Sequence, residues 1–338
     1  MNQKQPINVG IIGFGFMGRT HTKAYQDALS DGYPCTITAI ADANLEDLSQ
    51  PQNSGNIDTD QQIVDTPSIE FHNDADAIIN HPDIDLISIC THTDTHVDLA
   101  IAALNANKHV LVEKPIAINP ADVKRLAAAA EQADRLCIPA MCMRHWPAWI
   151  KIHEIIQSNK FGPVRSAAFH RLGSRPTWAA GFYSDQSRSG GVLHDLHIHD
   201  TDFIYHCFGK PDAVTTTGDH LHLTTLYHYP GIPHVTAQGA WDNQPSLGYQ
   251  MKCTIAFEHA TLDFDFSRES QLMLHQADQS TPIETSPLTG YDNEIRCMLD
   301  QISSNKQDNQ PIQDAVLIAQ VLEAEQQSMA SRTSVSIS

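Results

Sequence analysis

Short apolar segments alternate with longer mixed segments along the first 142 residues. Short apolar runs are typical of strands that are buried on both faces of a parallel sheet, and the mixed segments between them read as helices. The expected strands cover residues 8–12, 36–41, 85–90, 109–112 and 136–141, and the expected helices cover residues 17–29, 94–105 and 120–133. This alternation predicts an α/β fold with a parallel sheet and right-handed crossover connections.

Local signals refine several of these elements. Asp94 stands where a helix N-cap is expected, and Asn119 followed by Pro120 predicts a capped helix with proline at its first position. Pro139 lacks a backbone donor, so the strand over residues 136–141 is expected at a sheet edge. Residues 43–70 are polar and rich in Gln, Asn and Asp, which indicates a short helix with loops.

The second half of the chain starts a different pattern. Residues 166–172 alternate like a strand, which sends His170 and Arg171 to opposite faces. A chain of 338 residues is too long for one ordinary core, so two domains are expected. We place the first domain at residues 1–142 and the second at residues 143–338.

Composition narrows the classes of partner. The chain carries 40 acidic against 21 basic side chains, a formal net charge of −19, which disfavours nucleic acid and anionic membrane surfaces as partners. No apolar run approaches ~20 residues, and the polar N-terminus lacks a secretory signal. Seven cysteines without CxxC pairing indicate reduced thiols. We therefore expect a cytoplasmic protein with no membrane span.

A glycine-rich turn follows the first expected strand and opens the first expected helix. It consists of Gly13, Phe14, Gly15, Phe16, Met17 and Gly18. In this context glycines let the backbone approach a pyrophosphate at a helix N-terminus. Asp42 ends the second strand, where a carboxylate binds ribose hydroxyls and repels a 2′-phosphate. No Lys or Arg occurs in residues 43–62, so NAD is favoured over NADP; the alternative is a glycine turn without a ligand.

Two further segments carry reactive side chains. Glu113-Lys114-Pro115 follows the strand over residues 109–112, at the strand end that faces the ligand in such sheets. Lys114 can reach the nicotinamide and the reacting hydroxyl from there, and a cis peptide before Pro115 would fix its direction. The alternative is an ordinary strand end with a surface ion pair.

The second segment, residues 189–202, predicts a helix with Asp195, His199 and Asp202 on one face. An Asp–His pair suits acid–base chemistry, although a purely structural pair is the alternative. A zinc site is a rival hypothesis; its candidate ligands are His194, Asp195, His197 and His199. We expect no metal, because His194 and His197 lie on a different helix face from His199.

Together these segments resemble the Gfo/Idh/MocA family, the group of glucose–fructose oxidoreductase and inositol dehydrogenase. The resemblance extends over nearly the whole chain. It is carried by four segments, residues 13–21, residues 103–115, residues 190–202 with the pattern GG-xxx-D-xxx-H-xx-D, and the tail from 291 to 335.

The resemblance implies a dinucleotide-binding Rossmann domain at residues 1–142. It implies that residues 143–338 form a substrate-binding and oligomerisation domain, an α/β domain with a large, mostly antiparallel open sheet. It implies Lys114, Asp195 and His199 as catalytic residues. Beyond the glycine turn and Asp42, the expected cofactor contacts are Thr91, His92, His96, Glu113 and Lys114. The implied activity is dehydrogenation of a carbinol carbon in a sugar, cyclitol or related polyol, by a homodimer or homotetramer.

Three positions depart from the family pattern. His92 replaces a usual proline, Asn107 replaces a usual glycine, and His197 replaces a usual small residue. We expect the first two to affect local turn shape. His197 is expected to enter the substrate pocket.

Other substrate contacts rest on aromatic and guanidinium chemistry. Arg144, Trp146 and Trp178 are candidates, because aromatic faces stack on sugar rings and Arg binds hydroxyls or acid groups. Core packing is an equal alternative for both tryptophans. Two other functions remain open in the same fold: a redox-neutral NAD-dependent glycosidase or epimerase, and a non-catalytic dinucleotide-binding sugar sensor.

Overall fold

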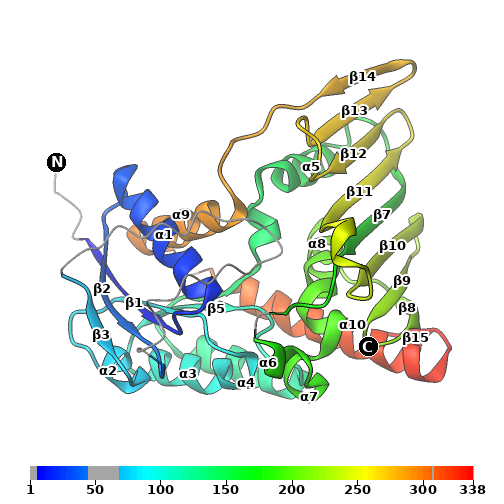
Figure 1. Cartoon of the computed structure of the whole chain (residues 1–338). Coiled ribbons are helices and arrows are strands. Elements are labelled where there is room, and N and C mark those ends of the chain that lie inside the picture. The colour runs from blue at the N-terminus through cyan, green and yellow to red at the C-terminus, as the bar shows by residue number, and fades with distance from the viewer. Residues whose placement is uncertain (1–5, 45–67, 178, 307, 338) are drawn as a thin grey trace. The chain divides into compact units, whose positions relative to one another are not determined.

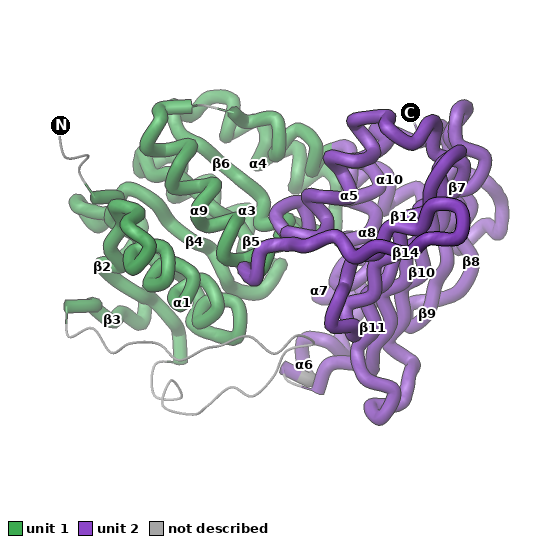
Figure 2. The backbone as a smooth tube through the Cα atoms, turned by 90° about the horizontal axis from the view of Figure 1, so that it is seen from above, with its two compact units in different colours: residues 1–142, 289–316 green, residues 143–288, 317–338 purple. Residues whose placement is uncertain are grey.

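The computed structural model describes residues 6–44, 68–177, 179–306 and 308–337. The chain divides into two compact units, coloured separately in Figure 2. Unit 1 contains residues 1–142 and 289–316, and unit 2 contains residues 143–288 and 317–338. Elements are labelled along the chain in Figure 1.

Unit 1 is built on a six-stranded parallel sheet with the order β3-β2-β1-β4-β5-β6. Its strands are β1 (Ile7–Ile12), β2 (Cys35–Ala41), β3 (Glu70–His72), β4 (Leu86–Ile89), β5 (His109–Glu113) and β6 (Cys137–Ala140). The five strands expected from the sequence are confirmed, and β6 lies at the predicted edge. Fully buried Val9, Leu86, Ile87 and Val110 explain the short apolar runs.

The helices of this half of the chain are α1 (Phe16–Ser30), α2 (Ala75–Ile79), α3 (Thr93–Asn105) and α4 (Pro120–Gln132). Asn119 caps α4 as predicted, because its side chain accepts the N–H of Ala121. The predicted cap Asp94 is wrong: α3 starts one residue earlier, after His92, and Asp94 lies in its first turn. An acidic side chain is favourable there too, which makes the two positions hard to separate by sequence.

The sequence missed β3 and α2, which lie at the end of the polar segment and after it. The expectation of a helix with loops over residues 43–70 falls largely on residues 45–67, outside the described residues. β3 has only three residues, none of them buried, so no apolar run marks it.

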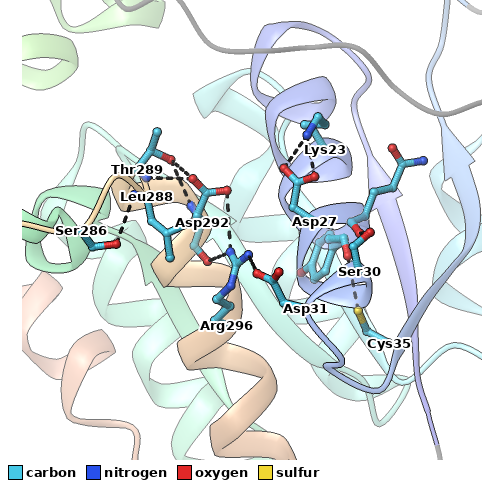
Figure 3. A network of polar contacts seen from close by, with 12 residues as sticks. Lys23, Asp27, Ser30, Asp31, Cys35, Ser286, Leu288, Thr289, Asp292 and Arg296 are labelled. Carbon is cyan, nitrogen blue, oxygen red and sulfur yellow. Dashed lines mark hydrogen bonds and ion pairs between the residues drawn. The ribbon is translucent and has the colours of Figure 1, made fainter.

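Helix α9 (Gly290–Ser303) groups with unit 1, although the sequence-based division places residues 289–316 in the second domain. Ile295, Met298 and Leu299 join the core that holds Tyr25 of α1. Figure 3 shows Arg296 of α9 paired with Asp31 at the end of α1. The buried apolar face of α9 therefore packs this late segment of the chain into the core of unit 1.

Unit 2 contains a nine-stranded sheet with the order β14-β13-β12-β11-β7-β10-β9-β8-β15. Its strands are β7 (Val164–Leu172), β8 (Ala213–Gly218), β9 (His222–Tyr229), β10 (Ile232–Ala240), β11 (Gln250–Phe257), β12 (Thr261–Asp265), β13 (Leu272–Gln276), β14 (Gln279–Pro282) and β15 (Val335–Ser336). Only the β7–β10 pairing is parallel among the described strands of this sheet. The predicted mostly antiparallel sheet is confirmed.

The other helical elements are short, apart from α5, α8 and α10. The α-helices are α5 (Pro147–Ser158), α6 (Ala180–Tyr183), α7 (Gln186–Ser189), α8 (Ile198–Phe208) and α10 (Gln310–Ser331). Two 3-10 turns are η2 (Cys142–His145) and η4 (Pro245–Leu247). A π turn, η3 (Leu193–His197), directly precedes α8. Trp149 of α5 packs on Phe203 of α8 and on Phe169 and Phe264 of the sheet. Helices α5 and α8 thus cover one sheet face.

As the sequence predicts, His170 and Arg171 point to opposite faces of β7. Arg171 is buried beneath α8, whereas the half-buried His170 contacts Gln238. Among the described residues, no helix has the length and apolar character that crossing a membrane requires.

Candidate functional site

The glycine turn lies between β1 and α1, at the carboxyl edge of the parallel sheet. Gly13 has φ +89°, and a Cβ there would lie 2.8 Å from the carbonyl of Cys90. Gly15 caps α1 without a side-chain hydrogen bond, and the first turn of α1 carries no acidic residue. The N-terminal amides of α1 therefore meet no carboxylate of their own helix, which fits a pyrophosphate group.

Asp42 is fixed at the end of β2 by backbone amides. Its Oδ2 accepts the N–H of Phe14 at 2.7 Å, and its Oδ1 accepts the N–H of Asn44 at 2.8 Å. The carboxylate of Asp42 is thus hydrogen-bonded directly to the glycine turn. The structure adds a cation that the sequence count over residues 43–62 missed: Arg19 stacks over the Phe14 ring at 4.7 Å. Burial lowers the pKa of Arg19, while the charge of Asp42 acts in the opposite direction.

Lys114 follows β5, and its backbone N–H is held by Glu113 of that strand, which in turn pairs with His21 of α1. The N–H of Lys114 donates to Oε2 of Glu113 at 3.1 Å, and Oε1 of Glu113 lies 3.0 Å from Nε2 of His21 in α1. His21 and Glu113 are both buried, and the Lys114 side chain is half-buried. The predicted cis peptide between Lys114 and Pro115 is confirmed.

His96 connects the loop after β4 to this lysine segment. Its Nδ1 lies 2.9 Å from the Pro115 carbonyl oxygen, and its Nε2 lies 2.9 Å from the Thr91 carbonyl oxygen. Burial lowers the pKa of this ring, although both carbonyls act in the opposite direction. Since both nitrogens face backbone groups, His96 supports the loop. Its predicted direct contact with a cofactor finds no support in these contacts.

Two family departures have a local explanation. Asn107 has φ 64°, a left-handed conformation that glycine adopts freely and asparagine tolerates. His92 is exposed and has φ −76°, within the range of the proline usual at that position. Both substitutions therefore keep the turn shape. Thr91 is half-buried and accepts a hydrogen bond from Thr95.

The Asp–His segment lies in unit 2. Gly190 and Gly191 both have positive φ and lead into the π turn, which continues directly into α8. Asp195 and His199 are half-buried, while all the other residues from Leu196 to Asp202 are buried. These two predicted catalytic side chains thus share the exposed side of the helix.

Asp202 does not share that side, which corrects the prediction of a three-residue face. It is fully buried and forms a bidentate pair with Arg144, with Nη2 and Oδ1 at 2.7 Å. The physical reason is this pairing, because a buried carboxylate needs a charged or hydrogen-bonding partner and Arg144 of η2 supplies one in the interior. Asp200 is likewise buried and pairs with Arg171 of β7 at 2.7 Å.

The candidate zinc ligands have other partners. His194 is buried with its Nδ1 3.3 Å from the Gly190 carbonyl oxygen, and burial lowers its pKa. His197 is fully buried, and its Nε2 lies 3.1 Å from the Tyr227 hydroxyl and 3.3 Å from Oε2 of Glu325. Within the described ranges, no group of three or more His, Cys, Asp or Glu side chains is arranged to hold a metal.

The predicted substrate residues do not share one environment in the structure. Arg144 is engaged with Asp202, and Trp146 is 6% exposed and packs edge-on against Phe266. Trp178 lies outside the described residues. The burial of Trp146 favours the packing alternative. The full burial of His197 likewise argues against its expected entry into a substrate pocket.

Sequence reasoning missed the supporting residues His21, Tyr227 and Glu325, and it named Arg171 without its partner Asp200. Glu325 had a readable signal, because it occupies a buried position in the apolar stripe of α10 that includes Ile318, Val321 and Leu322. A carboxylate in such a stripe needs a polar partner.

Comparisons with known proteins agree with this organisation. An uncharacterised oxidoreductase of Escherichia coli is 34% identical over 43% of this chain and 41% of the relative. Myo-inositol 2-dehydrogenase of Thermotoga maritima is 27% identical over 60% of this chain and 55% of the relative. The chain thus matches about half the length of these relatives. The structure of levoglucosan dehydrogenase in complex with NADH and levoglucosan has the same fold, with TM-score 0.81, 20% identity, and 98% and 100% coverage.

Two family models match the two halves of the chain. Residues 7–141 match the oxidoreductase family with an NAD-binding Rossmann fold, and residues 149–266 match the C-terminal domain of the same family. Together these matches cover most of the chain, from β1 to the end of β12. The protein belongs to the Gfo/Idh/MocA family of oxidoreductases.

Proposed function

We propose that this protein is an NAD-dependent dehydrogenase that oxidises a carbinol carbon of a sugar, cyclitol or related polyol. The observation that carries the proposal is the exposed side of the π turn and α8, where Asp195 and His199 are half-buried while their neighbours are buried in polar pairs. The names of the relatives, a myo-inositol dehydrogenase and a levoglucosan dehydrogenase bound to NADH, support the substrate class.

Each residue has an assigned role in this proposal. His199 accepts the hydroxyl proton of the substrate as general base, and Asp195 orients His199 or hydrogen-bonds the substrate. Lys114 stabilises the alkoxide that develops on the same oxygen. When bound, the nicotinamide accepts the hydride that leaves the carbinol carbon. His21 and Glu113 hold the backbone of Lys114 and have no direct chemical role.

We also propose that NAD is preferred over NADP. Asp42 stands where the adenosine ribose binds in this fold, and its charge repels a 2′-phosphate. Arg19 weakens that repulsion but does not cancel it. Two backbone amides hold the carboxylate of Asp42 at the turn, so its negative charge stays beside the proposed ribose site. The predicted homodimer or homotetramer stays a prediction.

Replacing His199 tests the catalytic assignment. We expect His199→Ala to lower kcat by ~10²–10⁴-fold, the usual contribution of a general base, with little change in NAD affinity. The substrate is first found by screening aldoses, uronic acids, cyclitols and anhydrosugars with NAD for NADH absorbance. Cys207→Ser on the same helix, buried and away from the exposed side, serves as the control. Unchanged turnover in His199→Ala would remove this residue from the mechanism.

The same screen separates the alternatives. A redox-neutral glycosidase or epimerase forms product without net NADH, which product analysis detects. A sugar sensor binds NAD and sugar without converting either, which calorimetry detects. No specific observation in the structure favours these two functions over the dehydrogenase.

A further inference from the structure

A fully buried histidine lies between the two proposed catalytic residues of unit 2. His197 is two positions from Asp195 and two from His199, and its ring is turned into the interior of the unit. We propose that His197 is a positioning residue which, paired with Glu325 of α10, fixes the π turn that presents Asp195 and His199. This inference rests on the function proposed for those two residues.

The contacts around His197 form a closed polar cluster of four buried side chains. Its members are His197, Thr201, Tyr227 and Glu325. Thr201 donates to Oε1 of Glu325 at 3.3 Å, and the Tyr227 hydroxyl lies 2.8 Å from Oγ1 of Thr201. The His197 Nε2 completes the cluster at 3.1 Å from Tyr227 and 3.3 Å from Glu325. The cluster joins the π turn, α8, β9 and α10.

One assignment of protons satisfies the contacts of this cluster. Burial and the charge of Glu325 raise the pKa of Tyr227 well above its usual value, so its hydroxyl stays protonated. Thr201 donates to Glu325, so the Tyr227 proton goes to Thr201, and Nε2–H of His197 donates to the Tyr227 hydroxyl oxygen. Oε2 of Glu325 lies 3.3 Å from the same nitrogen, but neither it nor Nδ1 of His197 has a hydrogen-bond partner among the described residues. A proton on Nε2 therefore fits these contacts, because a proton on Nδ1 would be buried without an acceptor.

The space for the imidazole comes from a missing side chain on the sheet. A Cβ at Gly239 of β10 would lie 3.2 Å from Cβ and 3.4 Å from Nδ1 of His197. The ring is therefore held between the strand backbone on one side and Glu325 and Tyr227 on the other. A ring confined in this way fixes the backbone two residues on either side of it.

Other buried pairs hold the following turn of the helix, but not the π turn itself. Asp200 pairs with Arg171, and Asp202 pairs with Arg144, beyond the turn toward the C-terminal end. The Glu325 cluster is thus the anchor on the side of Asp195.

Three variants test the inference. His197→Ala removes the imidazole ring, and Glu325→Leu removes the carboxylate beside it. Gly239→Ala places a methyl group against the ring and keeps both Tyr227 and Glu325. We expect each to lower kcat by ~10- to 100-fold, the size of effect that misplaced reacting groups produce, with NAD affinity unchanged. Glu325→Gln keeps an acceptor oxygen for Thr201 and the shape of the side chain, so it should lose less activity than Glu325→Leu.

A stability-matched control separates positioning from general damage. Phe203→Leu removes packing from α8 without touching the cluster, so its Tm should fall while its kcat stays within about twofold of the wild type. If kcat follows Tm alone across all five variants, the inference is overturned.

A second readout does not depend on turnover. Nitrogen-15 spectra of labelled histidine, with the His199 signal assigned from His199→Gln, should show a shifted His199 signal in His197→Ala and Gly239→Ala but not in Phe203→Leu. An unshifted signal contradicts positioning even if the protein is a dehydrogenase. A wild-type protein that makes no NADH, with the expected shifts, contradicts the proposed function and leaves positioning supported.

Discussion

The carboxylate of the single residue Asp42 has two roles, one in the structure of the glycine turn and one in the proposed binding of the cofactor. It accepts the N–H of Phe14 within the glycine turn and the N–H of Asn44 after β2, so it fixes the turn as well as the charge at the proposed ribose site. The position is therefore both structural and electrostatic.

Asp42→Ala separates these tasks. We expect NAD affinity to fall by ~10- to 100-fold, because hydrogen bonds to a charged group are worth about 1.5–3 kcal/mol. NADP binding should suffer less, because the repulsion of its 2′-phosphate is removed, so the ratio of the two dissociation constants moves toward NADP. Titration calorimetry with both cofactors measures this ratio. Asp27→Ala on α1 removes the same charge from an ion pair with Lys23 and should leave the ratio unchanged.

Among the helices and strands, α9 comes late in the sequence but belongs to unit 1, together with residues 1–142. Its capping box is formed by Thr289 and Asp292, and its buried face enters the unit 1 core through Ile295. In Figure 3 this helix lies beside α1, joined by the Arg296–Asp31 pair. The apolar contact dominates, because an ion pair with an exposed partner contributes little.

Ile295→Ala should therefore weaken unit 1. We expect a loss of about 2–5 kcal/mol in the free energy of unfolding, the usual cost of an Ile→Ala cavity in a core. Urea unfolding, followed by circular dichroism, measures it. Asp300→Ala on the exposed side of the same helix should change stability by less than about 0.5 kcal/mol. Equal effects in the two variants would contradict the packing of α9 in this core.

Two half-buried histidines, His109 and His145, give the whole molecule a sensitivity to acid. Burial, together with the charge of Arg135, lowers the pKa of His109 to about 4, and burial with the charge of Arg144 lowers that of His145 to about 4. Nδ1 of His109 accepts the N–H of Leu136, which only a nitrogen without a proton can do. Unfolding exposes both rings to water, where the pKa is about 6.5.

The sign of the pH dependence follows from these values. Between pH ~6.5 and pH ~4 the unfolded chain binds protons that the folded chain excludes, so stability is fully present above pH ~6.5 and is lost as the pH falls toward 4. We expect Tm to decrease over this window. His109→Gln should flatten the slope, whereas His259→Gln, at an exposed position, should not. A Tm that stays constant from pH 7 to pH 4.5 would refute this linkage.

The sequence by itself determined the local parts of this protein. Apolar runs predicted β1, β2, β4, β5 and β6, and the glycine turn with Asp42 predicted a Rossmann unit, because these signals depend on neighbouring residues in the chain. Half-buried Asp195 and His199 were also found from a local motif. Their role in catalysis and the cofactor preference stay predictions.

Only the tertiary structure decided what depends on contacts between distant segments. It placed α9 in unit 1, removed Asp202 from the face of His199, and buried His197 against Glu325, 128 positions further along the chain. None of these follows from local periodicity. The core selects whichever apolar face fits it, Arg144 pairs with Asp202 in the interior, and a buried imidazole is held by partners that only the folded chain brings together.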